Sequence, residues 1–172
     1  VSPGKVGTRE DAASGDFIVF MEGTAAMEWT ADLGTRWFEI DRSRLGWRFD
    51  IAREGELNSD APYAVDYPDW WGARVTIKLP YGGKGFRLQG DSVDKTVGDL
   101  YHFRRSVVLL AGMVVMESET KALSDQLPAA RAARVRAEMA ELATNSVFVR
   151  APSDYVPTDQ EKAETRRQEL AE

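Results

Sequence analysis

The stretch that decides the predicted fold is LGWRFDI, at residues 45–51. Its apolar residues alternate with Gly46, Arg48 and Asp50, so one face of the extended chain is apolar and the other is not. A period of two with a single apolar face indicates a half-buried strand of an antiparallel sheet. The stretch RVTIKL at residues 74–79 repeats this pattern and predicts a second strand of the same kind.

Shorter apolar runs extend the strand prediction over residues 16–90. These runs lie at residues 17–21, 26–30, 36–40 and 86–88. The run GGKG at residues 82–85 precedes the last of them, and glycines in this position favour a hairpin turn. We therefore expect five or six short strands in this part of the chain.

From residue 92 onward the spacing of apolar residues favours helices. The residues that follow this spacing are Val93, Val97, Leu100, Tyr101 and Val108. The helix prediction is carried on over 107–116, where four valines favour a strand but the leucines, alanine and methionine permit a helix. A second helix is predicted from residue 128 to 144, because the stretch is rich in good helix formers. Its apolar stripe consists of Ala132, Val135, Met139 and Leu142.

These patterns predict an α+β fold, with an antiparallel sheet of five or six short strands followed by two packed helices and an extended C-terminal arm. The predicted domain organisation has three parts. Residues 1–15 are a lead-in with little core, residues 16–145 are a single α+β domain, and residues 146–172 are an extension that docks on a partner. Within this extension, residues 147–149 are either a short strand or a docking peptide.

Composition excludes several classes of function. The 172 residues include 22 basic and 28 acidic ones, and a net charge of -6 argues against sequence-independent nucleic-acid binding. The chain has no Cys, so disulfides, thiolate metal sites and thiol nucleophiles are excluded. The longest apolar run, at 107–116, is too short for a membrane-spanning helix, which needs about 20 residues. Peripheral membrane association stays open.

No residue pattern in the sequence identifies a catalytic, metal or cofactor site. His102 is the one histidine, and we expect it to have a packing or surface role. The glycines at 82–85 lack the spacing of a phosphate-binding loop. The chain begins with Val1, which fits a mature form after removal of a targeting peptide or a trimmed chain, and the compartment is not indicated.

The most unusual stretch is the aromatic loop at residues 60–71, which holds four aromatic residues, three carboxylates and two prolines. In one interpretation the rings cover one end of the sheet and the aspartates shape the turns. In the other the loop contacts a partner or ligand, since aromatic residues are frequent at the centres of protein interfaces. The residues predicted to bind a partner are Tyr63, Tyr67, Trp70 and Trp71 of this loop and Phe148 and Tyr155 of the C-terminal extension.

Three hypotheses about function follow. The first is a non-enzymatic structural or accessory subunit, which contacts other protein subunits through the aromatic loop, the run at 107–116 and the C-terminal arm. The second is a ligand-binding β-domain with an apolar pocket for a lipid, a pigment or a sugar, lined by Trp29, Trp37, Trp47 and Phe49. The third is a hydrolase that uses the carboxylates of Asp60, Asp66 or Asp69.

Overall fold

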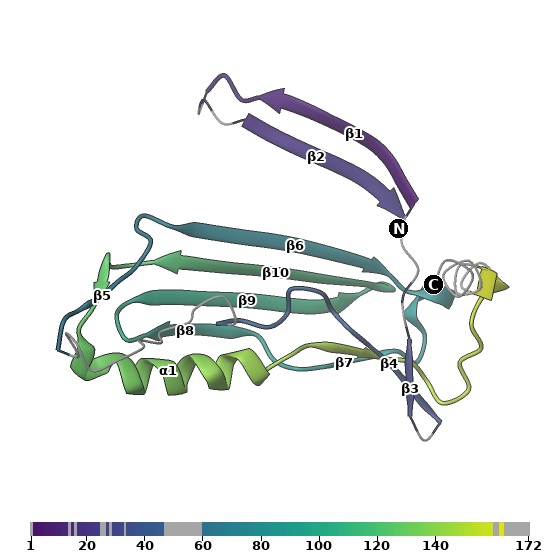
Figure 1. Cartoon of the computed structure of the whole chain (residues 1–172). Coiled ribbons are helices and arrows are strands. Elements are labelled where there is room, and N and C mark those ends of the chain that lie inside the picture. Colours follow the sequence, from purple (N-terminus) through teal and green to yellow (C-terminus); the bar gives the residue numbers. More distant parts are fainter. Residues whose placement is uncertain are drawn as a thin grey trace. The chain divides into compact units, whose positions relative to one another are not determined.

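The structure is a computed structural model, shown in Figure 1. It describes residues 2–13, 15, 17–24, 27, 29–32, 34–46, 60–159 and 162–163. Most of the strand predicted at 45–51 therefore lies outside the described residues. The chain divides into two compact units. The first comprises Val1–Trp29 and Tyr155–Glu172, and the second is Thr30–Asp154.

The first unit contains an antiparallel hairpin, formed by β1 (Ser2–Glu10) and β2 (Phe17–Thr24). At its turn the Gly15 N–H donates to the carbonyl of Asp11 at 2.7 Å. The strand predicted at 17–21 is thus present. Residues 1–15, expected to be a lead-in, mostly form β1, because β2 supplies backbone hydrogen-bond partners that residue types alone do not reveal.

The second unit is built on a long antiparallel sheet with the strand order β6-β10-β9-β8. The strand bounds are Trp70–Lys78 for β6, Val93–Val97 for β8, Tyr101–Leu110 for β9 and Met113–Ala122 for β10. β9 and β10 are joined by the two residues Ala111 and Gly112, which have φ angles of 48° and 77°. Two positive φ angles are what a tight hairpin turn needs to match the twist of its strands.

The prediction of a helix over residues 92–116 is wrong, because these residues form β8, β9 and the beginning of β10. The three-residue spacing of Val97 and Leu100 arises where the chain turns back between β8 and β9, and the Leu100 N–H donates to the Val97 carbonyl at 2.9 Å. In β9 the alternation of buried apolar residues is interrupted by a buried cation, Arg105. The charged residue conceals the period of two on which a strand prediction depends.

The predicted α+β class with two packed helices is also wrong. The described residues are mostly β and form several sheets. α1 (Ala129–Thr144) is the one α-helix whose bounds lie within them. None of the described helices is long and apolar enough to cross a membrane.

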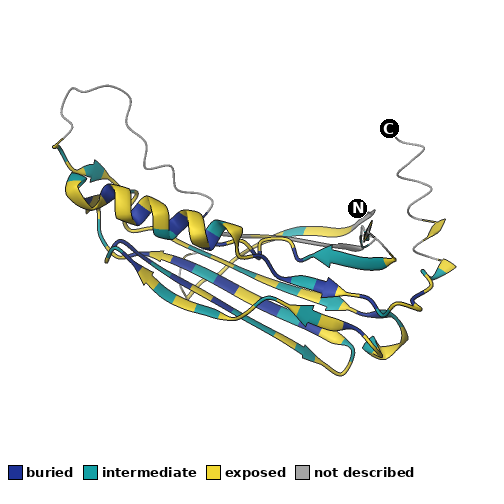
Figure 2. Cartoon of the chain, turned by 90° about the horizontal axis from the view of Figure 1, so that it is seen from below, coloured by how far each residue is buried: buried dark blue, intermediate teal, exposed yellow. Residues whose placement is uncertain are grey.

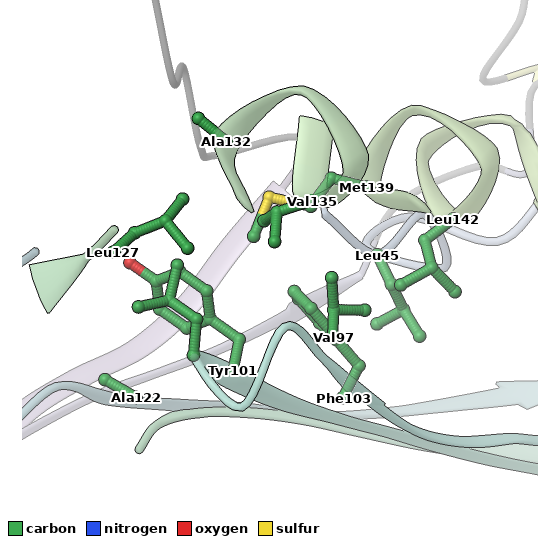
Figure 3. Close-up of a cluster of buried hydrophobic side chains, with 11 residues drawn as sticks. Leu45, Val97, Tyr101, Phe103, Ala122, Leu127, Ala132, Val135, Met139 and Leu142 are labelled. Carbon is green, nitrogen blue, oxygen red and sulfur yellow. The ribbon is translucent and has the colours of Figure 1, made fainter. Parts of the chain in front are cut away.

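The prediction of a helix at 128–144 is confirmed by α1, and so is its apolar stripe. The buried residues of α1 are Ala132, Val135, Met139 and Leu142. Figure 3 shows how they meet Val97, Tyr101 and Phe103 of the sheet and Leu45, which lies beyond β4. A Cβ atom on Gly98 would overlap with the side chain of Val135, so the helix packs directly on the turn between β8 and β9.

A smaller sheet continues beyond the end of α1, as Figures 1 and 2 show. Its strand order is β3-β4-β12-β7. The bounds are Thr30–Asp32 for β3, Thr35–Glu39 for β4, Arg87–Gln89 for β7 and Phe148–Arg150 for β12. β12 lies in the segment that the sequence assigns to the C-terminal extension, and here it is paired on both sides. A further short pair is formed by β5 (Tyr63–Ala64) and β11 (Gln126–Leu127).

The connection between β6 and β7 crosses from the long sheet to the smaller one. It contains the short 3-10 helix Pro80–Gly83. The hairpin turn predicted at 82–85 is therefore wrong, since its two flanking strands do not pair. The connection packs on the tip of the β9–β10 hairpin, where the Leu79 N–H donates to the carbonyl of Gly112 at 2.8 Å.

Among the described residues, Arg105 is the largest fully buried side chain, with 1% of its surface exposed. Its five N–H groups all donate to oxygens of three segments. Nε and Nη2 donate to the Asp91 carbonyl at 3.2 and 2.7 Å, and Nη1 donates to the carbonyl of Ser43. Asn145 accepts at its carbonyl (2.7 Å) and at Oδ1 (3.0 Å). Burial lowers the pKa of Arg105, and the charge of Asp91 opposes this effect.

We expect Arg105→Met to destabilise the fold by about 3 kcal/mol or more, because carbonyls of Ser43, Asp91 and Asn145 lose buried donors. Urea unfolding measures the effect. Arg104→Met is the matched control, because Arg104 is the next residue of β9 and is exposed. It should change the free energy of unfolding by no more than about 0.5 kcal/mol. Equal effects of the two substitutions would contradict the role of the buried guanidinium.

Gly82 and Gly83 offer a second matched comparison. Both have positive φ angles, 65° and 74°, so alanine is strained at either position. A Cβ on Gly83 would lie 2.7 Å from the Cα of Gly112, whereas a Cβ on Gly82 meets nothing within 4 Å. We expect Gly83→Ala to lower the free energy of unfolding by about 1 kcal/mol or more beyond Gly82→Ala. Equal losses would show that the hairpin tip shifts freely.

Candidate functional site

The residues predicted to bind a partner differ strongly in exposure. Tyr67 and Trp70 are 55% and 64% exposed. The others are more buried, and they are Tyr63, Trp71, Phe148 and Tyr155. Only the first two can therefore present a large part of their rings to a partner without rearrangement.

The more buried members of this set have contacts within the chain. Tyr63 packs against the hydrophobic core. The guanidinium of Arg42 lies 5.5 Å from the ring of Trp71. Two further ring pairs are Phe148 with Trp37, edge-on at 5.2 Å, and Tyr155 with Trp29, at 5.4 Å. These contacts stabilise the fold, and of the six residues predicted to bind a partner they leave Tyr67 and Trp70 available at a surface.

The exposed face of the long sheet, called the outer face below, lies opposite the face that carries Tyr101, Phe103 and Arg105. Figure 2 shows the alternation of buried and exposed positions along the strands. Residues of this face that are paired across neighbouring strands form five rows. The first two rows are Trp70, Lys121, His102 and Thr96, and then Gly72, Glu119, Arg104 and Asp94. The three rows that follow toward the β9–β10 turn are Arg74, Glu117 and Ser106, then Thr76, Val115 and Val108, and last Lys78, Met113 and Leu110. The outer face thus brings together Trp70 of the aromatic loop and the apolar run at 107–116.

Trp70 occupies one end of the outer face, where its indole is held in place. Its Nε1–H donates to Oε1 of Glu119 at 2.9 Å. A Cβ atom on Gly72 would lie 2.9 Å from two carbons of the Trp70 ring, so the ring crosses Gly72 where no side chain intervenes. Glycine at this position is what allows the indole to lie close to the sheet.

A groove of about 310 Å³ opens beside Trp70. The Arg, Ser and Glu residues that line it are Arg74, Arg104, Ser106, Glu117, Ser118 and Glu119. Arg74 Nη1 and Glu117 Oε1 form an ion pair at 3.0 Å. The groove therefore combines an exposed aromatic ring with charged groups of both signs.

His102 lies in the row at the same end of the outer face. Its Nε2 is 2.8 Å from Oδ1 of Asp94, a carboxylate that is exposed on β8. The sequence places His102 in a helix without naming a partner, and the structure places it in β9 with one. The imidazole is thereby oriented along the sheet.

Sequence reasoning missed Arg74, Arg104, Glu117 and Glu119 as members of one site. The signal that could have found them is the turn at residues 111–112. A hairpin centred there sets Glu119 opposite Arg104, whereas Glu117 comes next to Arg74 only through the separate pairing of β10 with β6. With residues 92–116 predicted as a helix, this pairing could not be seen.

The two other hypotheses from the sequence stay predictions. Trp47 and Phe49 of the expected Trp-lined pocket lie outside the described residues, and Trp29 and Trp37 have the ring contacts given above. For the hydrolase hypothesis, Asp60, Asp66 and Asp69 are all exposed.

A second hollow, of about 470 Å³, is lined by residues 38–44. Glu39 lies in it and accepts from Arg44 Nε and Nη2 at 2.6 and 2.8 Å and from Ser146 Oγ at 2.8 Å. The hydrogen bond from Arg44 is the largest cause of the lowered pKa of Glu39, and burial opposes it. This carboxylate is thus already engaged in linking β4 to the segment before β12.

Within the described part of the chain, no three His, Asp or Glu residues cluster in a way that could hold a metal ion. Comparison of the chain with protein-family models, with curated proteins and with solved structures gave no match.

Tyr101 links the aromatic loop to the core and gives a pH-dependent prediction. Burial, followed by the charges of Asp69 and Asp66, raises the pKa of Tyr101 from 10.0 to about 12. Below pH 10 the phenol is neutral in both states and its contribution to stability is complete. As the pH rises from about 10 to about 12, the unfolded state ionises first, so the free energy of unfolding falls.

We therefore expect Tyr101→Phe to flatten the pH dependence of urea unfolding in this range. Asp69→Asn and Asp66→Asn together should lower the pKa of Tyr101 without returning it to 10.0, because burial is the larger cause. Absorbance of the phenolate measures this pKa, with Tyr101→Phe as the blank. A Tyr101 that ionises at 10.0 in the folded protein would contradict the prediction.

Proposed function

We propose that the chain is a non-enzymatic structural or accessory subunit, which contacts another protein through the outer face of its long sheet. The observation that carries this proposal is an apolar patch at the end of the outer face distant from Trp70. Val108, Leu110 and Met113 are 46%, 63% and 39% exposed there. They are neighbours across β9 and β10, so the exposed area is continuous.

Two arguments support a protein as the occupant of this patch. Clustered apolar side chains on a sheet face lose free energy when they are removed from water, and such patches mark sites of protein contact. The opposite face of the same two strands already carries the buried core, as Val114 and Met116 are 1% and 0% exposed. Near the β9–β10 turn, β10 is thus apolar on both faces, a pattern typical of a sheet region that is covered on both sides.

The test is the size of the natural full-length protein in an extract of its source, measured by gel filtration with antibody detection. We expect elution well above the monomer at moderate salt. Val108→Lys combined with Leu110→Lys should move the protein to the monomer position. Leu123→Lys is the control, because Leu123 is 42% exposed but lies just beyond the end of β10.

Unfolding midpoints of the variants in urea check that the fold is retained. Elution of the wild type as a monomer would overturn the proposal. So would an unchanged assembly in the doubly substituted protein, because the patch would then have no part in it.

A further inference from the structure

The long sheet ends on one side in β6, and the outer edge of this strand is open. In the strand order β6-β10-β9-β8, β6 pairs with β10 on one side, and no other described strand pairs with it. β6 has nine residues, contains no proline and pairs with β10 without a bulge, whereas the opposite edge strand, β8, has five residues. Short, bulged or proline-containing edges hinder strand pairing, so the edge of β6 lacks these protections.

Hydrogen bonds at both ends of β6 show which of its backbone groups face this edge. The Leu79 N–H donates to the Gly112 carbonyl at 2.8 Å, and the Ala122 N–H donates to the Asp69 carbonyl at 2.9 Å. The register between these two bonds is continuous, so the odd-numbered residues of β6 direct their N–H and C=O groups to β10. The even-numbered residues of the range 72–78 therefore direct theirs to the open edge, where no described residue bonds to them.

On the core side, the side chains of β6 form an apolar row that one chain covers only in part. Trp71, Ala73, Val75 and Ile77 are half-buried, whereas the residues paired with them on β10 are all buried. A further strand beside β6 would remove more of this row from water. That strand needs apolar residues at every second position on the same side, and β6 itself has them.

A second copy of β6 fits this edge best in one antiparallel register. A twofold axis through Arg74 would place two like charges directly opposite each other, which destabilises a sheet. An axis through Ala73 would set Asp69 opposite Ile77, at the end of the apolar row. An axis through Val75 avoids both, because Ala73 then faces Ile77 and the row stays apolar. Axes nearer the ends of the strand pair fewer residues.

The outer face is also complementary in this register. Lys78 of one copy comes opposite Gly72 of the other, where the Trp70 indole lies over the glycine. Paired residues of neighbouring strands are about 5 Å apart, so the ammonium reaches the indole and Glu119, which accepts the indole N–H. Within the described part of one chain, Lys78 forms no ion pair. Twofold symmetry repeats the same contact on the other side of the axis.

We infer that two copies of this chain associate through their β6 strands, antiparallel and with Val75 on the twofold axis, so that the two long sheets become one. The pairs Gly72–Lys78 and Arg74–Thr76 then exchange backbone hydrogen bonds on both sides of the axis. A contact between two strand edges is smaller than a standard interface, so we expect a dissociation constant in the micromolar range. In a dilute extract this dimer dissociates, and the test of the proposed partner contact stays independent of it.

Sedimentation velocity of the purified chain, from about 1 µM to about 1 mM, measures this association. We expect a monomer–dimer equilibrium. Thr76→Pro should abolish the dimer, because it removes an N–H at the open edge that β10 does not use, and an edge strand tolerates proline at such a position. Thr76→Ala is the matched control, because it keeps the N–H and should dimerise like the wild type. Unfolding midpoints in urea check that both variants are folded.

The register is tested with single cysteines, because the chain has none of its own. Paired residues without mutual hydrogen bonds have Cα atoms about 4.5 Å apart, which allows a disulfide. Under mild oxidation, Val75→Cys should give a covalent dimer and Ala73→Cys should not. The reverse result would overturn the register.

The association itself has three results that would overturn it. They are a wild type that stays monomeric at the highest concentration, a folded Thr76→Pro that still dimerises, and a dimer that is lost in the doubly substituted protein with Val108→Lys and Leu110→Lys. The last result would assign self-association to the apolar patch. Failure of the proposed function is distinguishable, because it is measured in the extract and with the patch variants.

Discussion

The guanidinium of Arg105 is the interaction on which the second unit depends. A cation buried to 1% exposure is tolerated when every one of its donors is bonded. Here the acceptors are three carbonyls and one amide oxygen. They belong to Ser43, Asp91 and Asn145, so one side chain joins the segment after β4, the segment before β8 and the end of α1 to the middle of β9.

This arrangement also determines which face of the long sheet is closed. With Arg105 and Phe103 directed toward α1 and the core, the pleat directs Arg104 and Ser106 to the other face. Successive side chains of a strand point alternately to the two faces of the sheet, so burying one set exposes the other. The groove beside Trp70 and the apolar patch near the β9–β10 turn are therefore consequences of the same register that buries the core.

The prediction of the fold from the sequence succeeded where each pattern had a single interpretation. Residues 129–144 have good helix formers and a narrow apolar stripe, and both are found in α1. Residues 74–79 alternate cleanly, and they coincide with most of β6. The prediction failed over 92–116, because a buried arginine replaced an apolar residue in the alternation of β9. When the apolar residues of both sheet faces are read together, their spacing of three, four and seven residues is one that a helix would also produce.

The sequence by itself determined the local states of β6 and α1 and the absence of thiol chemistry, because these depend on residue type and near neighbours. Tertiary structure alone decided that Trp70, Arg104 and Glu119 meet on one surface. These residues are up to 49 positions apart in the chain, and the Trp70–Glu119 hydrogen bond spans that whole separation. Their meeting follows from strand register, which is set by the β9–β10 turn and by the burial of Arg105. No local pattern contains that information, since register is a property of paired strands.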